Sequence, residues 1–145
     1  MAGLPTAYLL FNGLLVILFG MFTGIPLRYA IIQKKDASVL NAWRVAHSVL
    51  VMDGLWLLII GLALPYLVLD RLSVWILVWS QIASGYGFVV AFTVGPWKGI
   101  RGLTFKPYGL NTFLFGAHTI GAAGAAIGAI IAVYGSLKAL LSFYN

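Results

Sequence analysis

The sequence contains no cysteine and no glutamate, and only 8% of its 145 residues are charged. Without cysteine, the chain can form no disulfide bond and no metal site built on thiolates. Two histidines and three aspartates are the main side chains left for acid–base chemistry or metal ligation. The histidines are not spaced four residues apart, as they are in many helical metal sites. A catalytic centre made of protein groups alone is therefore not indicated.

Apolar residues make up 62% of the chain, and the mean hydropathy is +1.02. A soluble domain of this size cannot bury so much apolar surface, so the sequence predicts an integral membrane protein. The net charge of +6 does not indicate nucleic-acid binding, because the basic residues lie in short segments between apolar runs. In such segments, Lys and Arg set membrane topology and contact anionic headgroups. The expected partner is the lipid bilayer, and the expected location is the inner (cytoplasmic) membrane of a bacterium.

Four apolar runs have the length of a membrane span, which is about 20 residues. We therefore expect an all-α integral membrane protein, a four-transmembrane-helix bundle that forms a single domain over residues 1–145. The expected spans are about 7–25, 46–69, 72–94 and 112–141. Pro26 is expected to close the first span, and Pro65 to kink the far end of the second. The first span lacks a basic leader and a small-residue cleavage site, so it is not predicted to be a signal peptide.

The loops are expected at residues 28–44, along the membrane surface, and at residues 95–111. Seven of the nine Lys and Arg residues fall in these two loops, so the positive-inside bias predicts that both are cytoplasmic. In the fourth span, Gly124 and Gly128 form a GxxxG pattern, which is typical of closely packed membrane helices. This helix is expected to pack tightly, either within the bundle or against another subunit.

Polar residues inside the spans have two readings. Asn12 in the first span is expected to hydrogen-bond to another helix. In the third span, a belt of polar side chains either lines a cavity or joins helices; it consists of Ser80, Gln81, Ser84 and Tyr86.

The run at residues 43–54 stands out because a histidine and an aspartate lie inside an apolar segment. Ionisable side chains within a span are costly, so they are rare and usually functional or paired. On a helix, His47 shares a face with Gly54, whereas Asp53 lies about 120° round the axis. Gly54 is expected to leave room beside the imidazole for something flat. The pattern suits a ligand to a planar cofactor, although a lone histidine in a span is more often a structural hydrogen-bonding residue.

Basic residues close to the depth of His47 are candidates to meet the anionic groups of such a cofactor: Arg44, Lys98, Arg101 and Lys106. Haem fits this description, because it combines an apolar macrocycle, an axial imidazole and two propionates that can reach basic residues at the interface.

Two short motifs in this chain resemble those of the styrene oxide isomerases. The segment 42–54, with the letters RVAHS at 44–48, is similar to the second span of that family. The loop at 101–105, with the letters RGLTF and with Pro107 after it, is similar to the loop before the family's fourth span. Chain length, the four spans and the order of the motifs agree as well, so the resemblance covers most of the chain.

The resemblance implies a trimeric membrane enzyme with haem b between subunits. Its ferric iron acts as a Lewis acid that opens a hydrophobic aryl epoxide, and hydride migration then gives an aldehyde. His47 matches the axial ligand of the family, so it is the expected metal ligand, with Arg44, Arg101 and Gly54 as the other cofactor-binding residues.

The resemblance also implies catalytic roles for Asp53, Tyr86 and Gln81. Asp53 stands where the family has a substrate-contacting asparagine, and it is expected to reach substrate across a subunit interface. The family's tyrosine in the third span falls at Phe88 or Val89 here, and Tyr86 is close by. An aspartate of the family falls at residue 80 or 81, so the chain departs from the family at all three positions.

Two other interpretations remain open at this point. The first is a haem-carrying or electron-transfer membrane protein, in which His47 and His118 ligate one iron. The second is a small structural or transport bundle without a cofactor, in which His47 and Asp53 pair with polar groups.

Overall fold

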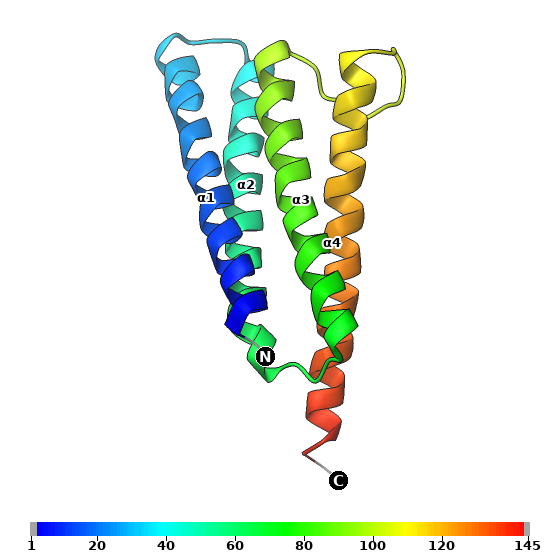
Figure 1. The fold of residues 1–145 in the computed structure, drawn as a ribbon. Coiled ribbons are helices and arrows are strands. Elements are labelled where there is room, and N and C mark those ends of the chain that lie inside the picture. The colour runs from blue at the N-terminus through cyan, green and yellow to red at the C-terminus, as the bar shows by residue number, and fades with distance from the viewer. Residues whose placement is uncertain (1–2, 144–145) are drawn as a thin grey trace.

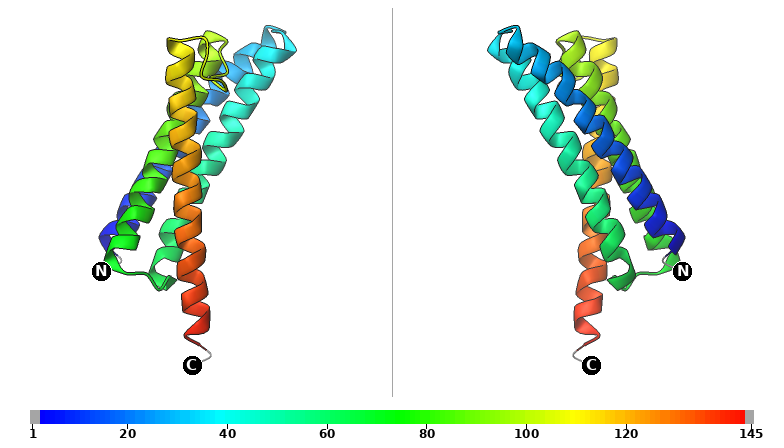
Figure 2. Two further views of the ribbon diagram at one scale, coloured as in Figure 1. Left: turned by 90° about the vertical axis from the view of Figure 1, so that its right-hand side faces the viewer. Right: turned by 90° about the vertical axis from the view of Figure 1, so that its left-hand side faces the viewer.

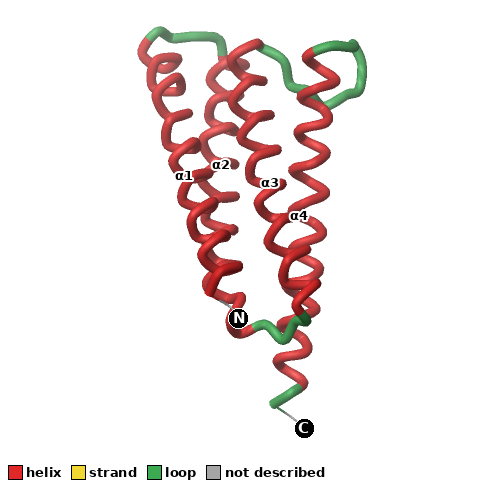
Figure 3. Tube along the Cα trace, in the orientation of Figure 1, coloured by secondary structure: helices red, strands yellow, loops and turns green. Residues whose placement is uncertain are grey.

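The structure is a computed structural model that describes residues 3–143, and nearly all of them are helical (Figures 1 and 3). In chain order, the elements are α1 (Gly3–Ile32), α2 (Ala37–Ala63), the 3-10 turn η1 (Leu64–Tyr66), α3 (Arg71–Lys98) and α4 (Leu110–Leu141). Each of the four long helices is long and apolar enough to cross a membrane. The prediction of an all-α integral membrane protein with four spanning helices is confirmed. Both described ends lie at one end of the bundle, and the loops 33–36 and 99–109 lie at the other (Figure 1).

The helices extend further than the sequence suggested. Pro26 lies inside α1, which continues to Ile32, and α2 already begins at Ala37. The expected long surface loop at 28–44 is therefore wrong, because only residues 33–36 separate the two helices. Beyond Pro26, Ala30 packs with Trp43 of α2 in a buried cluster, and this packing supports the last turns of α1.

The end of α2 also differs from the expectation. Pro65 does not kink a continuous helix: α2 stops at Ala63, and the proline lies in the 3-10 turn η1 that follows. A proline lacks the N–H that the next helical hydrogen bond requires, so a tighter turn replaces the last part of the expected span.

Helices α1 and α2 form one hairpin that is packed through glycines. Gly13 and Gly54 face each other across the contact, and a Cβ atom on Gly54 would lie 2.5 Å from Ile17 Cγ1 and 2.8 Å from the Gly13 carbonyl oxygen. About two turns further along α2, a Cβ atom on Gly61 would lie 3.1 Å from the Cβ atom of Leu9 in α1. Small residues let membrane helices approach closely, so this pattern holds α1 against α2 along their length.

Helices α3 and α4 form the second hairpin, and the GxxxG pattern lies in its seam. A Cβ atom on Gly124 would collide with the Ser80 carbonyl oxygen of α3, and one on Gly128 would collide with the Gln81 side chain. The tight packing predicted for the fourth span is confirmed. The glycines of α4 pack against α3 of the same chain, so this tight packing lies within the bundle.

The two hairpins meet mainly through α3. The Tyr86 hydroxyl group donates a 2.8 Å hydrogen bond to Asn12 Oδ1 of α1, so the interhelical role expected for Asn12 is confirmed. Near the end of the bundle that carries η1, a cluster of buried apolar side chains joins the hairpins: Leu9, Ile60, Leu64, Leu77, Val78 and Ile82. At the opposite end the hairpins diverge (Figure 2). At this end a cavity lies between α2 and the end of α3.

Candidate functional site

The imidazole of His47 lies half-buried on α2, against α1. Its Nδ1 atom is 2.8 Å from the backbone carbonyl oxygen of Gly20. A carbonyl oxygen can only accept, so the hydrogen bond assigns the proton to Nδ1 and leaves a lone pair on Nε2. Nε2 has no hydrogen-bond partner among residues 3–143 and does not belong to their buried polar atoms. A ligating nitrogen that is not buried is thus available on the α1–α2 hairpin.

Two glycines of α1 create the seat of this imidazole. A Cβ atom on Gly20 would lie 2.9 Å from both the backbone N and Cγ2 of Val51, so only glycine brings the Gly20 carbonyl this close to α2. One turn further, a Cβ atom on Gly24 would lie 3.5 Å from His47 Nδ1. The buried Thr23 hydroxyl group donates a 2.5 Å hydrogen bond to the same Gly20 carbonyl. The imidazole and the threonine therefore share one acceptor.

Gly54 does not have the role expected for it. It was predicted to leave space beside the imidazole, but Ile17 of α1 fills that space. The glycines beside His47 are Gly20 and Gly24, which were not predicted to belong to the site. Their four-residue spacing is a signal for close helix packing, but it does not reveal which residue of α2 they face.

Two arginines flank His47 on the side of the loop 33–36. Arg44 precedes His47 by three residues, about 4.5 Å along α2, and Arg28 follows Gly24 by four residues, about 6 Å along α1. Both side chains are exposed. Residues three and four apart lie on the same face of a helix, so both arginines project from the surface that carries the imidazole. Arg28 was not predicted as a site residue.

Arg101 lies in the loop between α3 and α4 and borders a cavity that is also lined by Ala42 and Val45 of α2. Val45 is two residues from His47 and therefore about 160° away around the α2 axis. Within one chain, α2 therefore lies between Arg101 and His47, and the expectation that both hold a haem bound between subunits stays a prediction.

The Asp53 side chain points into the helix bundle of its own chain. Its Oδ2 atom is buried without a hydrogen-bond partner, and it lies 3.4 Å from the position of a Cβ atom on Gly85 of α3. Val16 of α1 and Leu57 of α2 border the same point. This carboxylate oxygen is therefore enclosed by three helices of its own chain, and the reach of Asp53 to substrate across a subunit interface stays a prediction.

The predicted catalytic residues Tyr86 and Gln81 connect helices. The Tyr86 hydroxyl group is engaged with Asn12, as described above. Gln81 is fully buried, and its amide nitrogen contacts the carbonyl oxygens of Gly124 and Ala125 at 3.3 and 3.4 Å. Ser84 likewise donates to the Gly121 carbonyl oxygen of α4, whereas Ser80 bonds within α3, so three of the four polar residues of the belt join helices. A substrate-facing Gln81 was the wrong expectation, since its side chain fills the groove over the α4 glycines.

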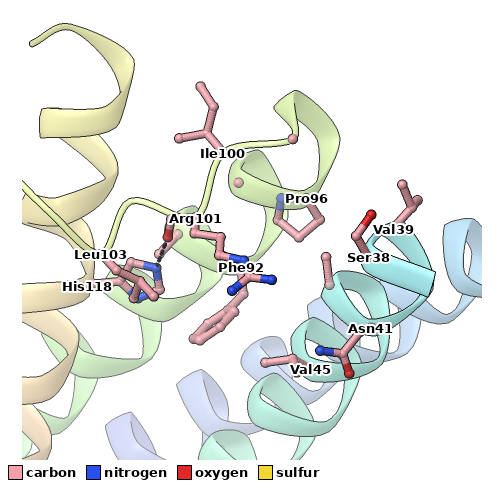
Figure 4. Close-up of a pocket in the computed structure, with 14 residues that line it drawn as sticks. Ser38, Val39, Asn41, Val45, Phe92, Pro96, Ile100, Arg101, Leu103 and His118 are labelled. Carbon is pink, nitrogen blue, oxygen red and sulfur yellow. Dashed lines mark hydrogen bonds between the residues drawn. The ribbon is translucent and has the colours of Figure 1, made fainter. Parts of the chain in front are cut away.

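His118 of α4 lies at the cavity that contains Arg101 (Figure 4). Its Nε2 atom is 3.1 Å from the Arg101 carbonyl oxygen, and the imidazole stands edge-on to the Phe92 ring at a centroid distance of 4.9 Å. The ring nitrogen left over is Nδ1, which lies next to the residue's own backbone and is poorly placed to meet a macrocycle. His47, in contrast, offers the outer nitrogen. Among residues 3–143, no cluster of three or more His, Asp, Glu or Cys side chains could hold a metal ion.

Comparison with known proteins gives one match. A model of a protein family described as styrene oxide isomerase matches residues 6–137, which is most of the chain. No curated protein and no solved structure matches the chain.

Proposed function

The chain belongs to the styrene oxide isomerase family, and we propose that it isomerises aryl epoxides to aldehydes with ferric haem b bound through His47. The observation that carries this proposal is the state of the imidazole: Nδ1 is hydrogen-bonded to the Gly20 carbonyl, and Nε2 is accessible without a partner. Histidines that ligate metals commonly donate the other ring N–H to a carbonyl or carboxylate in this way.

The residues around His47 fit a haem group. The apolar α1–α2 surface suits the macrocycle, and Gly24 adds no side chain beside the imidazole. Arg44 and Arg28 lie toward the loop end of the bundle, where they would hold the two propionates. Arginine forms strong, often bidentate hydrogen bonds with carboxylates. The apolar surface, the imidazole and the two arginines thus match the macrocycle, the iron and the propionates of haem, respectively.

When bound, ferric haem would supply a Lewis acid for the epoxide oxygen. The contribution of this chain is to hold and orient the site. His47 would fix the position of the group, and the Gly20 carbonyl would keep the imidazole in one tautomer and one orientation. The apolar environment would also exclude water, which matters because an opened epoxide that captures water becomes a diol and not an aldehyde. Isomerisation conserves every atom of the substrate.

The accessibility of Nε2 supports a homo-oligomer, which the family resemblance suggests is a trimer. Nε2 of His47 is not buried by residues 3–143, so a group held there would be only partly enclosed by one chain. A neighbouring copy would cover the rest of this group and enclose the hydrophobic epoxide between two chains. In this arrangement, residues of the neighbouring copy would face the substrate.

The function is tested by turnover of styrene oxide to phenylacetaldehyde by purified protein. We expect activity in the wild type and in His118→Gln, and none in His47→Ala. His118→Gln is the matched control because it removes the other histidine inside a span. If His118→Gln loses haem and activity as His47→Ala does, ligation by both histidines is the correct description. Aryl epoxide turnover by haem-free His47→Ala would refute a haem-dependent reaction.

A further inference from the structure

The loop that carries Arg101 is held rigidly at several points. Gly99 ends α3 in the left-handed region with φ of 67°, and the Ile100 amide donates a 2.9 Å hydrogen bond to the Gly95 carbonyl. Gly102 also has a positive φ, 62°, and a Cβ atom on it would lie 2.5 Å from Leu114 Cβ of α4. Between these two glycines, His118 fixes the Arg101 carbonyl oxygen.

This rigid loop presents an arginine that has no anionic partner. No ion pair or side-chain hydrogen bond involves the Arg101 guanidinium group among residues 3–143. The side chain extends from the loop into a cavity of about 440 Å³ between α2 and the end of α3 (Figure 4). No Asp or Glu lines this cavity. An unpaired guanidinium group that extends from a rigid loop, at a cavity without acidic residues, is suited to bind an anion.

The walls of the cavity show what kind of anion would fit. Val39 and Val45 of α2 and Phe92 of α3 provide apolar surface, and Leu103 of the loop continues it. The ligand should therefore join an anionic head to an apolar body. The cavity lies where the two hairpins diverge, at the loop end of the membrane-spanning helices (Figure 2). Trp43 and Trp97 pack edge-on near this end, and tryptophan is typical of the membrane–water interface.

We propose that this cavity is a binding site for an anionic phospholipid, with the phosphate on Arg101 and an acyl chain along Val45 and Phe92. Basic pockets between membrane helices are known sites for anionic headgroups. A zwitterionic headgroup would bring an ammonium group for which the cavity has no acidic partner. The site lies on the opposite face of α2 from His47, so the proposal does not depend on the proposed haem site or on the isomerase activity.

The test is lipid binding by the purified protein, measured by native mass spectrometry after delipidation. Phosphatidylglycerol and phosphatidylcholine with identical acyl chains are the two probes. We expect phosphatidylglycerol to bind at least about fivefold more tightly, because both lipids offer a phosphate but only phosphatidylglycerol keeps a net negative charge, whose attraction to one arginine is worth about that factor. Arg101→Gln should lose this preference, and Arg101→Lys should retain part of it. Lys35→Gln removes an exposed charge from the loop at the same end and should change the affinity less than twofold.

Three results would overturn the proposal. Arg101→Gln with unchanged phosphatidylglycerol binding would show that the guanidinium group is not the anchor. Equal binding of the two lipids by the wild type would show that the headgroup charge is not recognised. Displacement of the lipid by inorganic phosphate at equal concentration would identify a simple anion site without acyl-chain contacts. If Arg101→Gln does not fold, Val45→Trp, which fills the apolar wall, should weaken phosphatidylglycerol binding; unchanged binding would again refute the site.

Discussion

Replacing Gly20 with alanine is the sharpest perturbation of the site that leaves its functional side chains in place. The added Cβ atom would lie 2.9 Å from the backbone N and Cγ2 of Val51 and 3.1 Å from the carbonyl carbon of Leu50. Two of these three atoms belong to the α2 backbone, so rotation of a side chain cannot relieve the contact. Ordinary Cβ contacts begin near 3.4 Å, which means that α1 must retreat from α2 by 3.4 minus 2.9, or about 0.5 Å.

The retreat would stretch the hydrogen bond that orients His47. Adding about 0.5 Å to the present 2.8 Å between Nδ1 and the Gly20 carbonyl oxygen gives about 3.3 Å, outside the usual range for N–H···O bonds. Loss of a hydrogen bond between a ligating histidine and its supporting group typically lowers metal affinity by about 10–100-fold. We therefore expect Gly20→Ala to weaken haem binding by that factor, although His47 itself is unchanged.

The assay is titration of haem into haem-free protein, followed by absorbance at the Soret band. Gly116→Ala is the matched control, because a Cβ atom on Gly116 of α4 would meet nothing within 4 Å. In a helix, this control change should be neutral or stabilise the protein by up to about 1 kcal/mol. Wild-type haem affinity in both alanine variants would refute the reasoning. A second readout is ¹⁵N NMR of haem-free His118→Gln protein, where the single remaining imidazole should carry its proton on Nδ1.

Three further predictions follow from contacts in the bundle. Thr23→Val removes the second donor to the Gly20 carbonyl, so the hydrogen bond between that carbonyl and the His47 imidazole should become stronger and the reduction potential of bound haem should fall. Spectroelectrochemistry measures this potential, and Thr23→Ser should keep the wild-type value. A higher potential in Thr23→Val would contradict the shared acceptor. Gly128→Leu places a side chain where Gln81 lies. Overpacking of this kind should destabilise the protein by about 1–3 kcal/mol or more without changing the oligomer mass. An unchanged midpoint of thermal unfolding would count against the packing of α3 on α4. For Asp53, we expect aryl epoxide turnover to survive in Asp53→Asn and to fall in Asp53→Ala at normal haem content; full activity in both would leave Asp53 without a catalytic role.

Much of the fold could be predicted from the sequence, because hydropathy and length are sufficient to identify spanning helices. The ends of the helices were less predictable. Pro26 is locally a signal for a helix end, but the packing of Ala30 against Trp43 carries α1 past it. The hydrogen-bonding role of Asn12 was predictable as a type of interaction, although its partner Tyr86 lies 74 residues away.

The candidate site was predictable only in part. His47 is conspicuous as an ionisable residue in an apolar run, and it needs no knowledge of its neighbours. Its acceptor, the carbonyl of Gly20, is 27 residues away and belongs to the backbone, so no side-chain pattern indicates it. Gly54 was misplaced because the sequence of α2 shows which residues share a face but not which neighbour each face meets. That information depends on how α1 and α3 pack against α2.

The central claim is that His47 holds haem through Nε2, and the most direct test is haem binding by His47→Gly with and without added imidazole. The variant removes the ligand but leaves the backbone, the Gly20 carbonyl and the arginines in place. We predict that the wild-type protein purifies with haem b, that His47→Gly purifies without it, and that free imidazole restores haem binding and the Soret band to this variant. Full haem content in His47→Gly without imidazole would contradict the account.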